Sequence, residues 1–306
     1  MSSFFNNFYY GKAGKADFTP DQLPKNRVEL FFSTLRVRFG GLFGLSLLYS
    51  LFCIPALIWS YINVQMLFYA ENPLNYMTTY LLIMIPCLGI CGIGAPGLMY
   101  ILRNWARDQH SFTLSDFKDA VKGNWKQGLA VGLVNGLSLF LMWISYSFYG
   151  QMAATSSLIF VIPQAMVIIA GCVWWMMNMI IYTMMVTYDM KFSQLVRNSA
   201  IMVVARLPLS IGIWLLSLLI PVLIALLAPM GPFFTMLYLM VLGYALNGFL
   251  YASYANSCFD KFLNPRIEGA QVNMGLRDPS LDDGLNDDDD LDENDLTKEK
   301  DLTKEK

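Results

Sequence analysis

Residues 82–101 read LIMIPCLGICGIGAPGLMYI, and residues 103–126 read RNWARDQHSFTLSDFKDAVKGNWK. The first stretch contains no charged side chain, so it is suited only to lipid or to a deep protein core. The second stretch carries five Lys or Arg residues and is suited to water at a membrane surface. Together the two stretches predict a membrane protein and indicate which side of the membrane the connecting loop faces.

Long segments without charge extend over most of the chain. A helix needs about 20 apolar residues to cross the hydrocarbon core of a bilayer. The uncharged segments 39–70 and 72–102 therefore hold one span each, and 127–188 and 207–259 hold two each. We predict an all-α, polytopic integral membrane protein with six transmembrane helices, at about residues 40–63, 78–102, 127–148, 164–187, 207–227 and 233–255.

Basic residues predict the orientation of these spans. All 21 Lys and Arg residues lie in the N-terminal segment, in the loops 103–126 and 189–206, or in the C-terminal segment. Because basic residues accumulate on the cytoplasmic side, both termini and both loops are expected to be cytoplasmic, in a multi-pass protein of the plasma membrane. Residues 1–38 and 256–306 are then cytoplasmic segments around a membrane domain at 39–255.

The two cytoplasmic ends have different compositions. Near the N-terminus, Asn26 and Glu29 have the spacing of a helix-capping box. The apolar residues that follow recur at helical spacing, so we expect an interfacial amphipathic helix that runs into the first span. The C-terminal tail is acidic from about residue 278 and contains the run Asp287–Asp290. Such a composition cannot bury enough apolar area to fold, so we expect a disordered tail.

The second span is interrupted by glycine and proline. Such a density predicts either a kinked span or two half-helices, which transporters use to place backbone groups around a substrate. Three of the glycines also match a GxGxxG pattern, but a dinucleotide site needs a preceding strand, and apolar residues flank this one on both sides. The candidate broken-helix residues are Pro86, Gly89, Gly92, Gly94, Pro96 and Gly97.

Small and polar residues mark other positions within the spans. The third span begins with a stripe of small residues that predicts close helix packing: Gly128, Gly132 and Gly136. Uncharged polar residues either hydrogen-bond between helices or line a site for a neutral, hydroxyl-rich solute such as a sugar: Asn135, Gln164, Asn178 and Asn247. Trp174 and Trp175 lie well inside a span, where they pack as rings or line a cavity.

The loop between the second and third spans contains a further helical pattern. Thr113 and Asp116 have capping-box spacing. Phe117, Val121 and Trp125 then recur on one face of a short surface helix. This face is either a connector packed under the bundle or a docking surface for a partner, and the spacing leaves both open.

Several classes of chemistry are disfavoured by the residues present. No predicted span contains Asp, Glu, Lys, Arg or His, which argues against a proton-driven pump. The sequence lacks the common catalytic motifs, and its five cysteines show neither a disulfide framework nor zinc spacing. We therefore expect no enzymatic activity, no cofactor, no metal site and no nucleic-acid partner.

Three segments carry a resemblance to a known family. They are FCIPALIW at 52–59, GIGAPGLMYILRNWARD at 92–108 and FTLSDFKDAVKGNWKQGL at 112–129. These segments resemble the YesL-type family of bacterial membrane proteins, whose biochemical function is unknown. The stretch at 4–27 is similar to a subgroup of that family, and the resemblance covers about residues 1–262.

The resemblance implies a function in carbohydrate metabolism. Members are helical membrane proteins of Gram-positive bacteria, and their genes often accompany carbohydrate-utilisation systems with ABC-type sugar importers. The resemblance therefore implies a non-enzymatic accessory component of carbohydrate uptake, with importer permease subunits as partners. The alternative is a stand-alone facilitator or channel-like transporter for a small neutral solute. The family defines no catalytic residues that could be assigned to this chain.

Overall fold

The computed structural model describes residues 23–67, 73–228 and 230–277. All regular structure within these residues is helical, and six helical stretches are long and apolar enough to cross a membrane. The predicted all-α membrane fold with six spans is therefore confirmed. The predicted disorder of the tail from about residue 278 lies outside the described residues.

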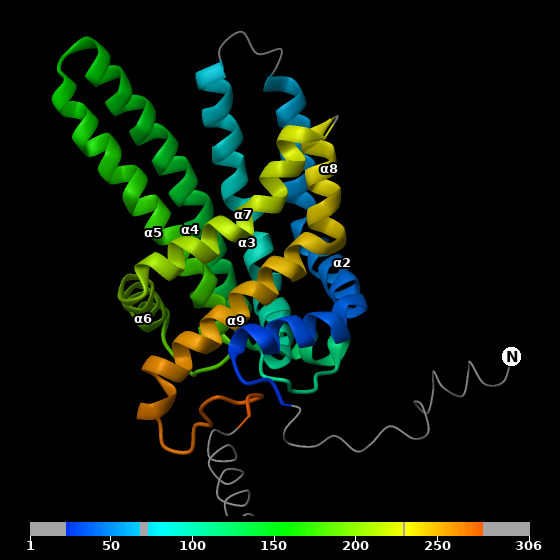
Figure 1. The fold of residues 1–306 in the computed structure, drawn as a ribbon. Helices are drawn as coiled ribbons and strands as arrows, with labels where there is room; N and C mark the ends of the chain where they lie inside the picture. The colour runs from blue at the N-terminus through cyan, green and yellow to red at the C-terminus, as the bar shows by residue number, and fades with distance from the viewer. Residues whose placement is uncertain (1–22, 68–72, 229, 278–306) are drawn as a thin grey trace, which may run out of the picture. The chain divides into compact units, whose positions relative to one another are not determined.

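The helices follow one another with short connections, as Figure 1 shows. The first four long helices are α2 (Arg27–Leu67), α3 (Pro73–Trp105), α4 (Thr113–Thr155) and α5 (Val161–Met185), with the short η2 (Leu158–Phe160) before α5. The remaining elements are α6 (Phe192–Ala205), α7 (Leu207–Leu227), α8 (Gly231–Tyr238), the π-turn η3 (Leu239–Gly243), α9 (Tyr244–Phe262) and η4 (Asn264–Arg266).

Contacts divide the chain into two units, residues 1–30 with 275–306 and residues 31–274. In the first unit, Asn26 Oδ1 accepts a hydrogen bond from the N–H of Glu29 at 2.9 Å. The Glu29 carboxylate in turn accepts from the N–H of Lys25 at 2.9 Å. The bond to Glu29 satisfies an amide group that the first turn of a helix leaves unpaired, and the bond from Lys25 fixes the residue before the cap. The predicted helix start at Asn26 is confirmed.

The helix α4 is longer than the sequence patterns predict. The helical pattern around Phe117 and the third span are one continuous helix, α4, of 43 residues. No proline separates the two parts, and the helix passes through Gly123 without a break. The predicted capping box is displaced by one residue, because the Asp116 carboxylate accepts from the N–H of Phe112 rather than from that of Thr113. The expectation of a separate surface helix is therefore wrong.

The glycines of α3 and α4 bring these helices into backbone contact. A methyl group at Gly92 would overlap the carbonyl oxygen of Gly128, and one at Gly132 would overlap the carbonyl oxygen of Leu88. A methyl group at Gly136 would meet the Cα of Ile85. Such contact is the packing expected of small residues at membrane helix interfaces. We call this contact between α3 and α4, defined by these glycines, the α3–α4 seam.

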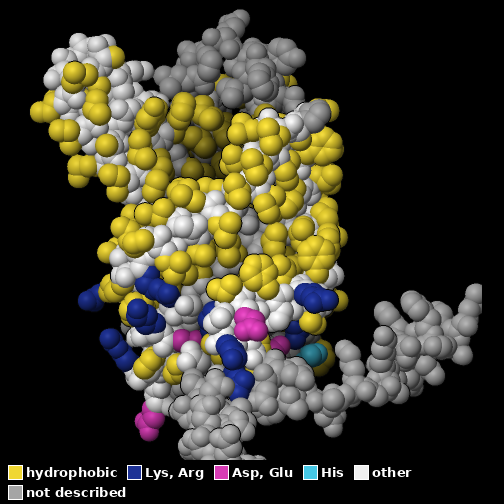
Figure 2. Space-filling view, in the orientation of Figure 1, with side chains coloured by type: hydrophobic (Ala, Val, Ile, Leu, Met, Phe, Trp, Pro, Cys, Tyr) yellow, Lys and Arg dark blue, Asp and Glu magenta, His cyan; other side chains and the backbone are white. Residues whose placement is uncertain are grey.

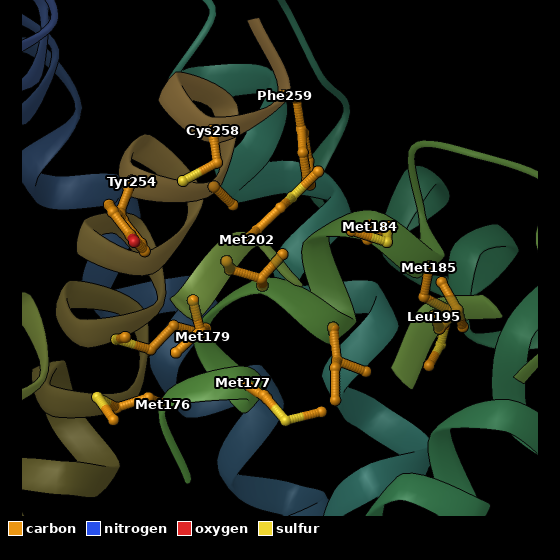
Figure 3. Close-up of a cluster of buried hydrophobic side chains, with 14 of the residues drawn as sticks. Met176, Met177, Met179, Met184, Met185, Leu195, Met202, Tyr254, Cys258 and Phe259 are labelled. Carbon is orange, nitrogen blue, oxygen red and sulfur yellow. The ribbon is translucent and has the colours of Figure 1, made fainter. Parts of the chain in front are cut away.

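A methionine-rich cluster fills the core between α5, α6 and α9 (Figure 3). Met179, Ile180 and Met184 of α5 are fully or almost fully buried, and Met202 of α6 and Phe259 of α9 pack against them. Methionine is unbranched and flexible, so it fills gaps between helices of irregular shape. This cluster gives α6 a buried face, although the sequence indicates only a loop with some helical spacing at 189–206.

Charged side chains of residues 31–274 gather at one end of the helices, and apolar side chains cover the visible face beyond them (Figure 2). The connections at this end include residues 106–112 and 186–191. They belong to the basic loops that the sequence assigns to the cytoplasm. We call this end the basic end and the opposite end the outer end.

Candidate functional site

A cavity of about 290 Å³ lies between α2, α3, α4, α5 and the α8–α9 stretch. Three of the four predicted polar residues line it, namely Asn135 of α4, Asn178 of α5 and Asn247 of α9. No Asp, Glu, Lys, Arg or His is among its lining residues. We call it the central cavity. Its aromatic lining consists of Tyr49, Trp175, Tyr182, Tyr244 and Tyr251.

A hydrogen-bond network holds two of the asparagines in place. The indole N–H of Trp174 donates to Asn135 Oδ1 at 2.9 Å, and Asn135 Nδ2 donates to Asn178 Oδ1 at 2.9 Å. Asn178 Nδ2 then donates to the carbonyl oxygen of Trp174 at 3.0 Å. A carboxamide offers two N–H donors and two acceptor lone pairs. Each asparagine therefore keeps hydrogen-bonding capacity beyond this network.

The wall of the central cavity also holds a polar group without a partner. Among the described residues, the indole N–H of Trp175 is buried and makes no hydrogen bond. Buried polar groups are normally hydrogen-bonded, because leaving one unpaired costs about 1–3 kcal/mol. Close by, the rings of Tyr49 and Tyr244 meet edge to face, with centroids 5.1 Å apart. The cavity thus combines aromatic faces with carboxamides, and the Trp175 indole N–H is enclosed in its wall.

Gln164 is the predicted polar residue that does not reach the central cavity. Its Nε2 donates to the carbonyl oxygen of Tyr146 at 3.1 Å, which joins α5 to α4 toward the outer end. The polar residues therefore have two structural roles. Asn135, Asn178 and Gln164 hydrogen-bond between helices, and Asn135, Asn178 and Asn247 line a cavity.

The candidate broken-helix residues lie on an unbroken helix. The helix α3 runs from Pro73 to Trp105 with Pro86 and Pro96 inside it, so the two half-helices of the sequence analysis are absent. A methyl group at each of the remaining glycines would meet a side chain of a neighbouring helix: Gly89 meets Leu133, Gly94 meets Phe52 and Gly97 meets Phe117. These residues let other helices approach α3, and Gly92 also borders the central cavity.

The candidate docking residues on α4 do not share one exposed face. Phe117 is 4% exposed and packs in a core cluster with Val121 at its side. Both face Gly97 of α3. Trp125 is 43% exposed, with the Lys126 ammonium 5.7 Å from its ring centroid. Of the two alternatives left open for this face, the packing of Phe117 and Val121 against α3 favours the connector packed in the bundle, and Trp125 is the exposed residue of the three.

A second hollow, of about 680 Å³, opens at the basic end. It lies between the first turns of α4 and the α5–α6 connection, and Asp116, Asp119, Lys126 and Asp189 line it. We call it the basic-end groove. Tyr188 forms part of its wall and donates to Asn264 Oδ1 at 2.6 Å. Burial raises the pKa of the Tyr188 phenol to about 12, and the positive charges of Arg107 and Arg103 oppose this shift.

Comparison with known proteins gives a partial assignment. Residues 42–146 match the model of a family described as a protein of unknown function, DUF624. The match includes α3, most of α2 and most of α4, and therefore the α3–α4 seam and Asn135. No curated protein and no solved structure matches the chain. The chain is thus a membrane protein whose first three spans are similar to a family without an assigned function.

The tyrosines of the central cavity are not predicted from the sequence. A signal for them exists in α9, where Tyr244, Asn247 and Tyr251 are three and seven residues apart and share one helix face. Tyr49 and Tyr182 have no such marker. Tyrosine is common near membrane surfaces, so a single tyrosine within a span does not indicate a cavity.

Proposed function

We propose that this chain is a non-enzymatic, multi-pass protein of the plasma membrane that binds a small, neutral, hydroxyl-rich solute and takes part in carbohydrate uptake. The observation that carries the proposal is the central cavity, in which Asn135, Asn178 and Asn247 converge with aromatic rings and no charged group. Ligand sites typically combine an apolar wall with a few placed polar groups. Carboxamides both donate to and accept from hydroxyl groups.

The charge of the cavity limits the kind of solute. A lining without ionisable acids or bases offers no counter-charge to an ion and no obvious proton relay. It is compatible with an uncharged molecule that moves along its own concentration gradient. The small volume of about 290 Å³ favours a solute of about one sugar ring. The YesL-type resemblance, with its carbohydrate-utilisation context, supports the same class of solute.

Titration of the purified protein with neutral monosaccharides and polyols tests this proposal. We expect a saturable change in tryptophan fluorescence, because Trp175 lines the cavity. Asn247→Leu should weaken binding about tenfold, which corresponds to 1.4 kcal/mol for lost hydrogen bonding. Gln164→Leu is the matched control, since Gln164 lies outside the cavity. Absence of saturable binding by every solute, or equal binding by both variants, would contradict the proposal.

A second candidate function is that of an accessory subunit of an ABC-type sugar importer. The observations in its favour are the basic-end groove and, separately, two apolar side chains at the start of α4, Phe112 and Leu114, which are 70% and 72% exposed. Large apolar side chains at a water-facing end favour contact with a partner. In this function the groove, together with Phe112 and Leu114, contacts a permease subunit.

Mild-detergent purification from native cells tests the accessory function. We expect importer permease subunits in near-equal amount with the tagged protein. Leu114→Glu should remove them, and Ser115→Glu should retain them, because Ser115 places the same charge on an exposed neighbouring position without removing apolar contact. Purification of the chain without any importer subunit would leave the solute-binding function as the one candidate.

A further inference from the structure

A third hollow of about 370 Å³ lies next to the central cavity. Residues of α2, α3, α7 and α8 line it, including Ala56, Met84, Ala225 and Thr235. Because α8 follows the outer connection between α7 and α8, this hollow lies nearer the outer end, and we call it the outer pocket. Its lining also lacks Asp, Glu, Lys, Arg and His.

The outer pocket and the central cavity share part of their walls. Leu88 of α3, Leu239 and Tyr244 line both hollows. Leu239 begins the π-turn η3, and Tyr244 is the first residue after it. Two of the three side chains that line both hollows therefore belong to the first residue of the five-residue π-turn and to the residue directly after it.

The π-turn connects α8, which lines the outer pocket, to α9, which lines the central cavity. Before it, α8 lines the outer pocket through Pro232, Thr235 and Met236. After it, α9 lines the central cavity through Asn247 and Gly248. An α-helix advances about 100° per residue, since it has 3.6 residues per turn. Removing the extra residue of the π-turn would therefore rotate one helix face relative to the other by about that angle.

Two buried serines of α2 hold the π-turn. The Ser46 hydroxyl donates to the carbonyl oxygen of Leu239 at 3.1 Å, and the Ser50 hydroxyl shares its proton between the carbonyl oxygens of Ser46 at 2.8 Å and Met240 at 3.1 Å. The backbone N–H of Tyr244 also bonds to the Leu239 carbonyl, in the wide spacing of a π-helix. Single π-turns are rare in helices and recur at functional sites. The serines favour this form because their hydroxyls bond carbonyl groups of the turn.

We propose that Leu88, Leu239 and Tyr244 form a gate between the outer pocket and the central cavity, and that the π-turn held by Ser46 and Ser50 is its hinge. The gate gives a neutral solute access to the central cavity from the outer end. This inference rests on the proposed solute-binding function, since it assigns the route by which the solute arrives.

A native cysteine provides the reporter for a test. Cys91 lines the central cavity, does not line the outer pocket and is 8% exposed. A variant with Cys53, Cys87, Cys172 and Cys258 replaced by Ala keeps this thiol as its sole label site. In liposomes, a small membrane-impermeant thiol reagent added from the outer side measures how often the gate opens. Addition from the basic end measures access by the other route.

Two substitutions should move the labelling rate in opposite directions. Ser46→Ala with Ser50→Ala should raise outer-side labelling of Cys91 at least threefold, because the hinge loses both side-chain bonds. Leu239→Trp should lower it at least threefold by filling the partition. The matched controls are Ser199→Ala, a buried serine bonded within α6, and Leu226→Trp, which is 76% exposed on α7. Both controls should leave labelling unchanged.

The outcomes separate this inference from the proposed function. Unchanged labelling in the serine and Leu239 variants, or labelling from the basic end alone, would overturn the gate. Solute binding is measured on the same variants by fluorescence, and its outcome does not depend on the labelling rate. Binding without gated labelling would retain the proposed function and reject the gate, and gated labelling without binding of any neutral solute would reject the proposed function.

Discussion

The α3–α4 seam and the contact between α2 and the π-turn join helices in different ways. Along the seam, glycines such as Gly92 and Gly132 allow backbone to touch backbone, so neither helix has room to shift. At the π-turn, Ser46 and Ser50 reach across with hydroxyl groups. Leu239 of the second contact lines both hollows of the outer route, whereas of the seam residues Leu88 lines both hollows and Gly92 lines the central cavity. The comparison teaches that this bundle separates a fixed helix pair from an adjustable one.

The largest expected effect comes from adding a methyl group within the α3–α4 seam. Gly132→Ala would place a methyl group on the carbonyl oxygen of Leu88. Since backbone must move to relieve this overlap, we expect the free energy of unfolding to fall by about 2–3 kcal/mol. Thermal unfolding of the detergent-solubilised protein measures the change.

The same helix supplies the control for this prediction. A methyl group at Gly123 of α4 meets no atom within 4 Å. Gly123→Ala should therefore leave stability unchanged or raise it by up to about 1 kcal/mol, through higher helix propensity. Equal losses in the two variants would show that close packing does not distinguish the seam.

An intermediate effect is expected at the polar network beside the central cavity. Asn135→Leu removes the bonds that Asn135 makes with Trp174 and Asn178. Membrane hydrogen bonds contribute about 0.6 kcal/mol each, and unpaired buried partners add to the loss, so we expect about 1–2 kcal/mol. Gln164→Leu breaks one bond between the same helices and should cost less. A larger loss at Gln164 than at Asn135 would contradict this assignment.

A smaller effect is expected at the adjustable contact. Ser46→Ala together with Ser50→Ala removes both hydroxyl contacts with the π-turn and the Ser50 bond to the Ser46 carbonyl, for about 1 kcal/mol of unfolding free energy in total. The loss stays small because the Leu239 carbonyl also accepts from the backbone N–H of Tyr244. Thermal unfolding of this double variant beside Gly132→Ala measures the contrast directly. A greater loss in the serine variant would reverse the comparison between the two contacts.

The smallest effect is confined to alkaline pH and involves Tyr188. Burial raises the pKa of its phenol to about 12, above the usual value of 10.0. The neutral phenol therefore stabilises the folded protein below pH 10, and this contribution is lost as pH rises from about 10 to 12. The decrease in stability over this window should be smaller in Tyr188→Phe. Identical pH profiles for the two proteins would contradict a buried phenol at this position.

The sequence predicts the six spans well because uncharged length is a strong physical signal in lipid. The sequence does not predict which face of each helix packs against which neighbouring helix. Gly92 and Gly132 are visible as small residues, yet their pairing depends on how α3 and α4 align in space. Asn135 and Asn178 are visible as polar residues, yet their meeting depends on the same alignment. The π-turn has no sequence marker, because its extra residue is stabilised by distant serines rather than by local propensity.

The length of α4 has a mechanical consequence. Its 43 residues correspond to about 65 Å of continuous rod, which exceeds the hydrocarbon thickness about twofold. Asp116 in the basic-end groove and Asn135 in the central cavity are fixed on this one rod. A stiff rod transmits tilt and torque along its length without relay contacts. Because Asn135 stands between Gly132 and Gly136, the α3–α4 seam anchors the cavity part of this rod against α3, and the groove lies on the part of the rod that extends beyond the seam.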